Sequence, residues 1–482
     1  MIRTHETKEN KYFVGRTHEL SRLAEIKALP GSKIIVVHGR RRTGKTELIE
    51  QFFRNGNVLK FEGLEKGGEK RQQQAFTEQL IHYLGYSAGE NIENPTWTSL
   101  FKRVADVTSV GPWVLYLEEI QWMSSYTDAL IVELKYVWDN FLRKNDQLIL
   151  VLCGSSPSFI KNKVLRSKAL YGRSIHELAL KPFSLRETRE FLSPGKSDIS
   201  VLDCYLTVGG IPEYLRYFNG QESVWNTLAK QSFISSGYFA TEYERIFVSS
   251  FGAKEIYKKI INFLAVNKFA SREEIRKKFS IESGGGLTKT LEELIEGGLV
   301  ADYSPYNSKV GSLLVRYSID DEYLQFYAKF ILPELKNIQQ NVYVDNPAKA
   351  IRLDIYRQWL GYSLERFCRK NHHKIAAVLG FSGVHYKSGA FFQRGDLNDH
   401  RGFQIDLVFK RQDRILTVCE IKYQSESTGT DIIDSFSEKL KRLSVGKQEV
   451  QKVLIAPHGV SRALLDRNYF DRILTLKDIM SF

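Results

Sequence analysis

The chain has 482 residues, which is long for one domain and predicts about three compact units. Hydrophobic residues make up 43% of the sequence and charged residues 26%, so each unit can bury a core of its own, which argues against a disordered chain. The formal net charge of +13 and the pI near 9.3 favour a polyanionic partner, chiefly nucleic acid, although a merely soluble basic protein would have the same balance.

The cysteines and the start of the chain predict a cytoplasmic protein without a membrane partner. The 4 cysteines form no CxxC pair, so the sequence predicts neither a zinc motif nor a disulfide framework. The first residues are polar and lack the apolar region of a signal peptide. No apolar run approaches the roughly 20 residues that a membrane-spanning helix needs.

Short apolar runs alternate with amphipathic stretches between about residues 31 and 180, and their Val, Ile and Leu content is typical of buried parallel strands. The segments between the runs are long enough for crossover helices. We therefore expect an α/β ATPase core with a parallel sheet over residues 12–184. The runs are Ile34–His38, Val58–Phe61, Trp113–Leu117, Leu148–Cys153 and Ile175–Leu180.

The segment Gly39–Thr46 matches GxxxxGK[ST], the phosphate-binding loop (P-loop), and it lies between a predicted strand and a predicted helix, as the motif requires. Backbone amides of such a loop close around phosphate oxygens at a helix N-terminus. Lys45 is expected to neutralise the β- and γ-phosphates, and the Thr46 hydroxyl to ligate Mg²⁺. The sequence thus predicts an ATPase with ATP and Mg²⁺ as cofactors, bound by Gly39, Thr43, Gly44, Lys45 and Thr46.

Two acids at the end of a buried strand form the second half of the predicted site. Glu118 is expected to hold Mg²⁺ through water and Glu119 to polarise the attacking water. Asp is usual where Glu118 stands, and the extra methylene could loosen the metal geometry, which leaves the turnover rate open. Ser155, at the end of the next strand, either lies near the γ-phosphate or caps a helix, and both interpretations stay open.

Beyond the core, the pattern changes twice. Residues 185–250 predict a helical lid broken at Gly209–Pro212, with a linker beginning within residues 219–237. Residues 251–345 predict a winged-helix domain, because three helices are followed by two apolar runs, and a small helical connector domain is the alternative. The predicted helices are residues 253–267, one opened by the capping box Ser271–Glu274, and residues 287–296; the runs are 299–303 and 313–317.

Residues 346–482 carry acids and a lysine in an order that resembles the PD-(D/E)xK nuclease core, within an α/β restriction-endonuclease-like domain. Glu365 lies on the amphipathic helix 353–372, Asp406 in the strand-like run 403–410, and Glu420 and Lys422 in the run 415–423. Positions i and i+2 of a strand share one face, and a hairpin can bring Asp406 opposite them. A helix over 432–444 and a strand over 450–456 are expected to follow.

That resemblance implies catalytic roles for all four residues. Asp406 and Glu420 would hold Mg²⁺, the metal would activate a water, and Lys422 would orient it or stabilise the developing charge. Ile405 stands where Pro is usual. The alternative is an exposed Glu-x-Lys pair on an edge strand, and the apolar neighbours of Glu420 argue against it. Lys439, Lys441 and Arg442 could meet phosphates or form a solvated helix face.

Six short stretches together resemble the archaeal-type ATPases, relatives of the STAND ATPases within the AAA+ class. They are Phe13–Arg16, Gly39–Leu48, Glu118–Gln121, Cys153–Ser156, Tyr171–Arg173 and Gly209–Tyr214. The resemblance covers roughly residues 12–480, since many members also carry a winged helix and a nuclease-like unit. It implies that Gly15 and Arg16 lie near the adenine, that Pro212 closes the base pocket, and that Arg173 is an arginine finger or sensor. A surface salt bridge is the alternative for Arg173.

These patterns predict a DNA-associated protein in which the ATPase state controls a Mg²⁺-dependent nuclease-like domain. Two alternatives remain open: a nuclease fold that only binds DNA or a partner while the ATPase acts as a switch, and an AAA+-type motor or loader of a mobile element. The expected partners are DNA, further copies of the chain, and a protein at the winged helix.

Overall fold

The computed structural model describes residues 2–6, 9–85, 95–167, 175–192, 195–251, 254–267, 269–281, 285–303, 315–393, 402–443 and 448–482. Contacts divide the chain into two compact units: residues 1–182 with 292–297, and residues 183–291 with 298–482. The finer division into four domains stays a prediction. In the described part of the chain, no helix is both long and apolar enough to cross a membrane.

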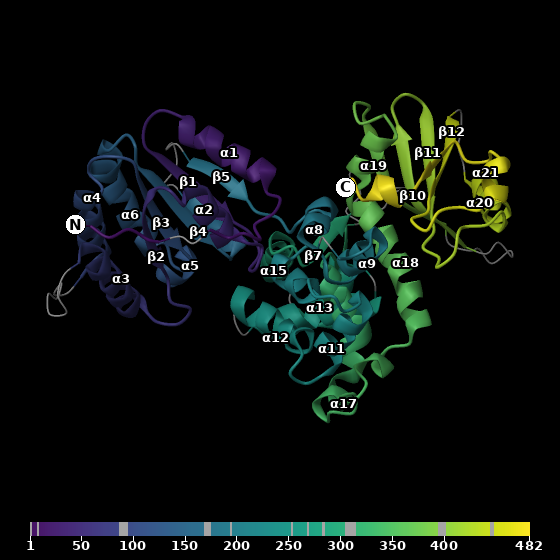
Figure 1. The fold of residues 1–482 in the computed structure, drawn as a ribbon, viewed down its shortest axis with the longest axis horizontal. Helices are drawn as coiled ribbons and strands as arrows, with labels where there is room; N and C mark the ends of the chain where they lie inside the picture. Colours follow the sequence, from purple (N-terminus) through teal and green to yellow (C-terminus); the bar gives the residue numbers. More distant parts are fainter. Residues whose placement is uncertain are drawn as a thin grey trace. The chain divides into compact units, whose positions relative to one another are not determined.

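A five-stranded parallel sheet with the order β2-β3-β4-β1-β5 forms the centre of the first unit (Figure 1). Each strand overlaps one predicted apolar run, so the predicted parallel α/β fold is confirmed. Because β4 lies between β1 and β3, one strand separates the P-loop strand from the strand that carries the acids. The strands are β1 (Lys33–His38), β2 (Asn57–Glu62), β3 (Trp113–Glu118), β4 (Ile149–Gly154) and β5 (Ile175–Ala179).

Alternate residues of these strands point to opposite faces of the sheet, and both faces are apolar and covered by helices. Ile35 and Tyr116 belong to the core beneath α1 and α2. Val36 and Leu117 belong to the opposite core, against α3, α4 and α6. The helices are α1 (Thr17–Ala28), α2 (Lys45–Phe53), α3 (Glu69–Leu84), α4 (Trp97–Val107), α5 (Ile120–Met123), α6 (Ala129–Asn140) and α7 (Pro157–Phe159), with turns at Leu142–Lys144 and Ile160–Leu165.

The second unit begins with the segment predicted as a lid, residues 185–250, and this segment forms short helices; we keep the name lid for these residues. The expected linker was wrong, because residues 219–237 contain α11. Ser223 caps this helix by accepting a hydrogen bond from the Asn226 backbone N–H, and Leu228 and Phe233 are buried on its inner face. The helices are α8 (Leu185–Leu192), α9 (Asp198–Val208), α10 (Pro212–Leu215), α11 (Val224–Phe233) and α12 (Tyr238–Phe251), with a turn at Arg216–Phe218.

Packing explains the two adjacent glycines at positions 209 and 210. The backbone N–H of Phe183 donates to the Gly210 carbonyl at 2.7 Å. A Cβ atom at Gly210 would lie 2.0 Å from the Phe183 carbonyl oxygen, so no side chain fits there. Gly209 has a φ of 72°, and a Cβ there would meet the Glu322 carboxylate. This close approach fixes the break between α9 and α10.

The middle of the second unit combines helices with a small antiparallel sheet of the order β6-β8-β7. The three predicted helices and the capping box between Ser271 and Glu274 are confirmed. The elements are α13 (Glu255–Asn267), β6 (Ala270–Ser271), α14 (Arg272–Lys278), α15 (Gly285–Glu296), β7 (Val300–Tyr303), β8 (Arg316–Ile319), α16 (Glu322–Phe326) and α17 (Leu335–Gln339), with turns at Tyr327–Ile331, Leu332–Glu334 and Pro347–Ala350.

The second unit ends in a five-stranded sheet of the order β13-β12-β11-β10-β9. Strands β9, β10 and β11 are antiparallel, and β12 and β13 run parallel to β11. The strand that carries Glu420 is therefore central, not an edge strand. The elements are α18 (Leu353–Lys370), α19 (His372–Val378), β9 (Tyr386–Gln393), β10 (Phe403–Arg411), β11 (Ile415–Ile421), α20 (Asp431–Arg442), β12 (Glu449–Ile455), α21 (Arg462–Asp466), β13 (Arg472–Leu474) and α22 (Leu476–Ile479).

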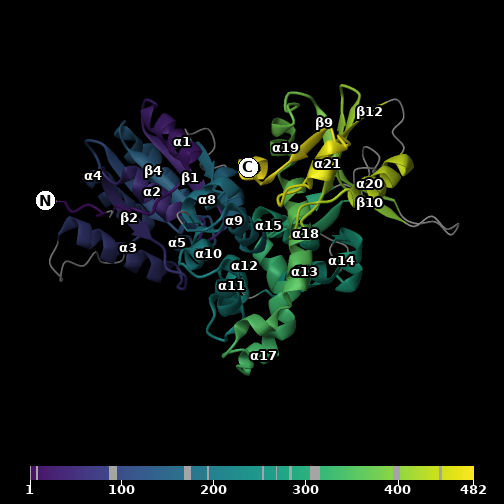
Figure 2. The same ribbon diagram turned by 45° about the vertical axis from the view of Figure 1, so that its right-hand side comes forward.

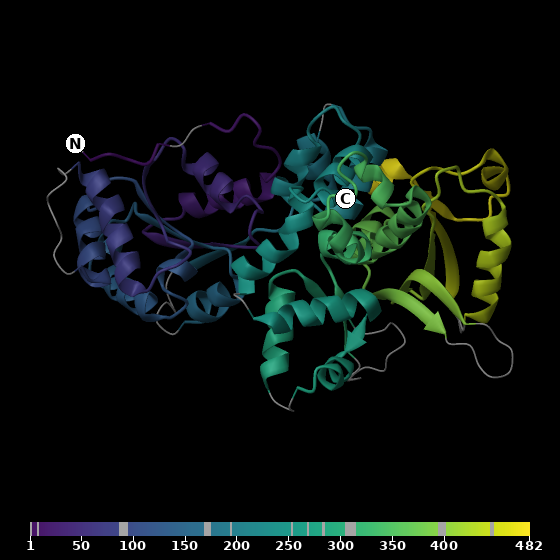
Figure 3. The same cartoon turned by 90° about the horizontal axis from the view of Figure 1, so that it is seen from below.

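Two helices cover this sheet. Helix α20 packs on one face through Ile432 and Phe436, and Figure 3 shows it lying along the strands. Helix α18 contacts β9, β10 and β11, and it also lies against α9 of the lid (Figures 1 and 2). One helix thus contacts both the lid and the C-terminal sheet.

Candidate functional site

The P-loop joins β1 to α2 through a backbone that glycine makes accessible. Gly39 and Gly44 have φ angles of 155° and 86°. A Cβ at Gly39 would lie 2.2 Å from the backbone oxygen of Leu180, at the end of β5, so the loop passes too close to that strand for any side chain. Gly44 is the residue from which α2 starts. The motif spacing predicted both glycines.

Lys45 is buried inside the loop. Its Nζ donates to the carbonyls of Gly39 and Arg40, at 3.0 Å each. The Thr43 hydroxyl donates to the same Arg40 carbonyl at 2.8 Å, which closes the turn. A lysine held at the start of a helix, beside glycine-rich backbone, fits the phosphates of a nucleotide.

Arg16 holds the P-loop through hydrogen bonds to backbone carbonyls. The arginine is buried and follows Gly15, which has a φ of 63°. Its guanidinium donates to the Thr43 carbonyl at 2.7 Å and to the Lys181 carbonyl at 2.8 Å. The structure therefore connects Arg16 to the P-loop backbone, while the proximity of Gly15 and Arg16 to an adenine stays a prediction.

The carboxylate of Glu118, the last residue of β3, contacts two hydroxyl groups and one ammonium group. The Thr46 hydroxyl and the Tyr116 hydroxyl both donate to its Oε1, the latter at 2.9 Å. The Lys60 ammonium lies 2.7 Å from Oε2. Thr46 and Glu118, the two predicted metal partners, are thus in direct contact. A hydroxyl and a carboxylate beside a P-loop suit Mg²⁺, which prefers oxygen ligands.

Glu119 is held in place by the end of the next strand. Its carboxylate accepts from the Ser155 hydroxyl at 2.7 Å, from the Ser155 backbone N–H at 3.1 Å, and from the Gln121 side-chain amide. Of the two interpretations of Ser155, the helix cap was wrong, since α7 starts from Ser156. Gln121 was not predicted as a site residue, although it lies in the Glu118–Gln121 stretch that carries the resemblance.

The roles of two further predicted residues are not tested by the structure. Arg173 falls outside the described residues, and its role as finger or sensor stays a prediction. Pro212 is the first residue of α10 in the second unit, where its fixed φ suits a helix start. Its role in a base pocket also stays a prediction.

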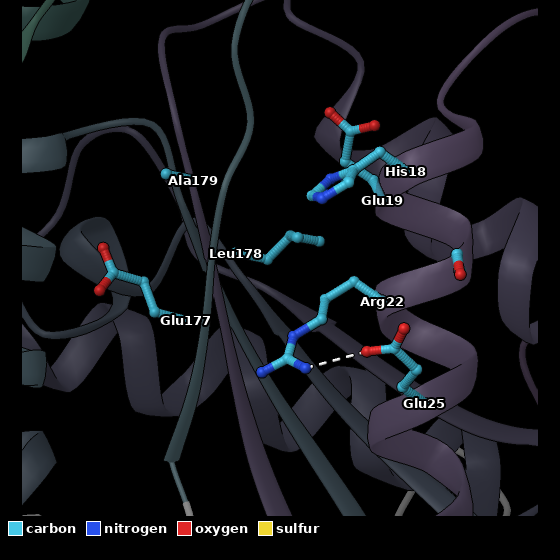
Figure 4. Close-up of a pocket in the computed structure, with 8 residues that line it drawn as sticks. His18, Glu19, Arg22, Glu25, Glu177, Leu178 and Ala179 are labelled. Carbon is cyan, nitrogen blue, oxygen red and sulfur yellow. Dashed lines mark hydrogen bonds and ion pairs between the residues drawn. The ribbon is translucent and has the colours of Figure 1, made fainter. Parts of the chain in front are cut away.

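A hollow of about 480 Å³ lies between α1 and β5 (Figure 4). Leu178 points from the strand toward the helix, where Arg22 and Glu25 form an ion pair at 3.0 Å. None of the P-loop residues lines this hollow. Its charged groups of both signs give no preference for a phosphate, so it is separate from the nucleotide site.

In the second unit, Glu365, Asp406, Glu420 and Lys422 come together as expected; we call them the carboxylate–lysine cluster. The pairing of β10 with β11, which aligns Leu407 with Cys419, places Asp406 beside Glu420. The Ile421 backbone N–H donates to the Asp406 carboxylate at 3.0 Å. The Lys422 ammonium lies 3.0 Å from Glu420.

Two further polar residues complete the cluster: Gln404, which the sequence did not indicate, and Lys439, which the sequence placed on a basic helix. The Gln404 amide lies 3.3 Å from Glu365 and 3.4 Å from Asp406, so it bridges the two acids. Lys439, on α20, donates to both oxygens of Glu420, at 2.7 and 2.8 Å. Its expected contact with phosphate or solvent gives way to an ion pair within the protein.

Electrostatics in this cluster favour neutralisation. Burial, with repulsion from Glu420 and Glu365, raises the pKa of Asp406 to about 7. Burial lowers the pKa of Lys422, but Glu420 outweighs it and the net pKa is raised. Carboxylates suit Mg²⁺, yet among the residues that the structure describes, no three His, Cys, Asp or Glu side chains have an arrangement that could hold a metal. At Glu420, the ammonium groups of Lys422 and Lys439 occupy the side of the carboxylate that a metal ion would bind.

Comparison with known proteins identifies the class of the N-terminal part of the chain. Residues 13–218 match the family described as the ATPase domain predominantly from Archaea. The chain therefore contains an archaeal-type P-loop ATPase domain, as the resemblance predicted for this part. An uncharacterized protein of Methanocaldococcus jannaschii is 25% identical over 414 residues, which cover 86% of this chain and 88% of that relative.

Solved structures resemble the chain in fold. The Walker-type ATPase of Pyrococcus abyssi has a TM-score of 0.50 and 16% identity, covering 67% of this chain and 98% of that one. The ORC2 protein of Aeropyrum pernix, in its ADPNP–ADP complexes, has a TM-score of 0.40 and 14% identity, covering 70% and 97%. The first likeness shows a shared P-loop ATPase fold and extends no further.

Proposed function

We propose that this protein binds and hydrolyses ATP, associates with DNA, and uses the nucleotide state of its P-loop domain to regulate a Mg²⁺-dependent nuclease-like C-terminal domain. The interpretation of α13–α15 and β6–β8 as a winged helix is part of the proposal, supported by three helices followed by a hairpin. Lys289 is exposed near the start of the third of these helices, where duplex contacts are usual.

The roles at the nucleotide site follow from its contacts. Lys45 would meet the β- and γ-phosphates, and Thr46 with Glu118 would hold Mg²⁺, which supplies charge neutralisation when bound. Glu119 would orient the attacking water. Ser155 and Gln121 would set the orientation of the Glu119 carboxylate, since both donate to it.

The proposed regulation rests on one observation: helix α9 forms hydrogen bonds to two of the segments that present the carboxylate–lysine cluster. The Tyr423 hydroxyl, one residue after Lys422, donates to Asp203 of α9. Thr207 of α9 bonds to the Tyr356 hydroxyl at 2.7 Å, on the helix that carries Glu365. These residues belong to one compact unit. A lid that moves with nucleotide state would therefore carry the cluster with it.

In the cluster, Asp406 and Glu420 are proposed as oxygen ligands, with Glu365 and Gln404 fixing Asp406. Mg²⁺, when bound, would activate a water for attack on a phosphodiester. Lys422 would stabilise the charge that develops on the phosphate. Lys439 would have to release Glu420 for the metal to bind. The affinity for metal would therefore depend on the strength of the ion pair between Lys439 and Glu420.

A plasmid-nicking assay tests the proposal. Supercoiled, linear and single-stranded DNA are incubated with the full chain and Mg²⁺ or Mn²⁺, with ATP, with a non-hydrolysable analogue, or without nucleotide. We expect metal-dependent cleavage whose rate changes with nucleotide, and none by Asp406→Ala. Equal cleavage by both proteins would indicate contamination and reject the nuclease assignment.

A second function is favoured by the lysines on Glu420. Since Lys422 and Lys439 already neutralise that acid, the domain could serve as a binding module while the ATPase acts as a switch. Failure of the wild type to cleave under every condition, with DNA retention that depends on nucleotide in a gel-shift assay, would support this function over the first.

A further inference from the structure

Lys60 makes an ion pair with the P-loop site without belonging to any of its motifs. It lies on β2, the strand beside the one that ends in Glu118, and its side chain is 15% exposed. Its Nζ lies 2.7 Å from Glu118 and 2.8 Å from Glu50 of α2. His5 contacts the same Glu50 oxygen at 3.2 Å. The lysine therefore bridges a strand-end acid and a helix acid.

The sheet register explains this position. Lys60 pairs with Tyr116 across the parallel strands, and Glu118 lies two residues beyond Tyr116, on the same face. Helix α2 covers that face of the sheet and contributes Glu50 to the contact with Lys60. A lysine in a buried strand is costly unless it is paired. Two carboxylates, Glu118 and Glu50, pair with the Lys60 ammonium and balance its positive charge.

We propose that Lys60 is a positioning residue of the nucleotide site, which holds Glu118 against Thr46 and competes with Mg²⁺ for that carboxylate. The inference rests on the proposed binding of ATP and Mg²⁺ at the P-loop. It also explains why Glu stands where Asp is usual. One oxygen of Glu118 accepts from Thr46 and Tyr116 while the other meets Lys60. An aspartate, one methylene shorter, would not reach all three.

The charge of Lys60 has opposite consequences for the two ligands. A fixed cation beside the P-loop attracts the polyphosphate of metal-free ATP. The same cation repels Mg²⁺ and shares the oxygens that Mg²⁺ would use. Unit charges a few ångströms apart near a protein surface interact strongly enough to change an equilibrium by about tenfold. The site should therefore bind ATP with unusually low dependence on Mg²⁺.

The test compares ATP binding by the full-length wild type and Lys60→Met, by calorimetry, in EDTA and across a Mg²⁺ titration. In Lys60→Met we expect the affinity for ATP in EDTA to fall about tenfold, and the Mg²⁺ concentration for half-maximal tightening to fall by about the same factor. Lys60→Arg should restore the wild-type Mg²⁺ dependence because it keeps the charge.

Lys33→Met is the matched control. Lys33 is a buried lysine of β1 in the same sheet, and among the described residues its ammonium bonds to the carbonyls of Lys27 and Leu29 and to no carboxylate. Lys33→Met should lower the melting temperature but leave the Mg²⁺ dependence of ATP binding unchanged. An identical Mg²⁺ dependence in wild type and Lys60→Met, both folded by circular dichroism, overturns the role of Lys60. A wild type that binds no ATP under any condition overturns the proposed function itself.

Discussion

The P-loop site and the carboxylate–lysine cluster both place a buried acid at the end of a central strand, and both neutralise it with lysine. At the P-loop the acid is Glu118, paired with Lys60. In the cluster it is Glu420, paired with Lys422 and Lys439. The difference lies in what surrounds the acid. The P-loop offers its anion-binding backbone and Lys45 from one continuous segment, whereas the cluster is assembled by side chains of α18, β10, β11 and α20.

This difference separates a site that is ready for its ligand from one that must rearrange. The P-loop already directs a helix N-terminus and a lysine toward a phosphate position. In the cluster, three acids lie together, and burial, with repulsion from Glu420 and Glu365, raises the pKa of Asp406. A metal ion would relieve that repulsion, but only after Lys439 gives up Glu420. We therefore expect the first site to bind its ligand tightly and the second to depend on conditions.

The largest effect should come from Lys45→Ala. It removes the ammonium that the carbonyls of Gly39 and Arg40 hold inside the loop. Because the charge on the β- and γ-phosphates then has no lysine partner, the affinity for ATP should fall about 1000-fold. Titration with a fluorescent ATP analogue measures it. Lys66→Ala, at an exposed lysine of the same unit, is the control. Wild-type affinity in Lys45→Ala would remove the P-loop interpretation.

The two adjacent acids should separate by role. Glu119→Gln should bind ATP normally and hydrolyse it at least about 100-fold more slowly, because the group that orients water is lost. Glu118→Gln should instead weaken the response to Mg²⁺. Phosphate release and ATP titration on both variants distinguish the two. Normal hydrolysis by Glu119→Gln, with failure of Glu118→Gln, would mean that the roles are reversed.

These sites also show what a sequence can reveal. Gly39, Gly44 and Lys45 are contiguous, and their spacing reflects one turn of backbone, so the motif predicts them. Asp406 and Glu420 could be placed together because a short hairpin limits how two strands pair. Lys60 and Gln404 join their sites as neighbours in space, and no spacing along the chain indicates them. Lys439 was expected on a basic helix, but its ion pair with Glu420 was not.

The missed elements have similar causes. Strand β9, with the sequence Tyr-Lys-Ser-Gly-Ala-Phe-Phe-Gln, lies at the sheet edge and lacks a continuous apolar run. Helix α11 was mistaken for the start of a linker because its flanks, Asn219–Ser223 and Ser235–Gly237, are polar and contain glycine. The burial of Leu228 and Phe233 against the rest of the unit stabilises this helix, and the sequence pattern does not reveal that burial.

A smaller effect should appear in the stability of the metal-free protein. The pKa of Asp406 in the folded state is about 7, above the ordinary value of 3.8. Its stabilising contribution is therefore present at low pH and is lost as the pH rises from about 4 through 7. Asp406→Asn lacks this loss and should be about 2 kcal/mol more stable than the wild type at pH 8, relative to their difference at pH 4.

Urea unfolding of both proteins in EDTA at several pH values measures that difference. Asp466→Asn, at an exposed carboxylate on α21, is the matched control and should follow the wild type at every pH. Parallel curves for Asp406→Asn and the wild type would show that burial and the neighbouring acids do not raise the pKa of Asp406.

The smallest effect should come from Tyr423→Phe, which tests whether the cluster responds to the lid. The change removes only the hydroxyl that donates to Asp203. Burial already raises the pKa of Asp203 to about 6, and the lost hydrogen bond leaves that carboxyl less well satisfied, so the free energy of unfolding should fall by about 1 kcal/mol.

The informative measurement is hydrogen exchange across α18 with and without a non-hydrolysable ATP analogue. In the wild type we expect the analogue to change exchange there, since α9 contacts that helix. In Tyr423→Phe the change should shrink. Tyr469→Phe is the control for the loss of a tyrosine hydroxyl. The Tyr469 hydroxyl lies 2.7 Å from that of Ser437 on α20, outside the lid, so this variant should keep the full response. An equal response in both variants would mean that nucleotide binding does not reach the cluster through this contact, and the two sites would then act independently.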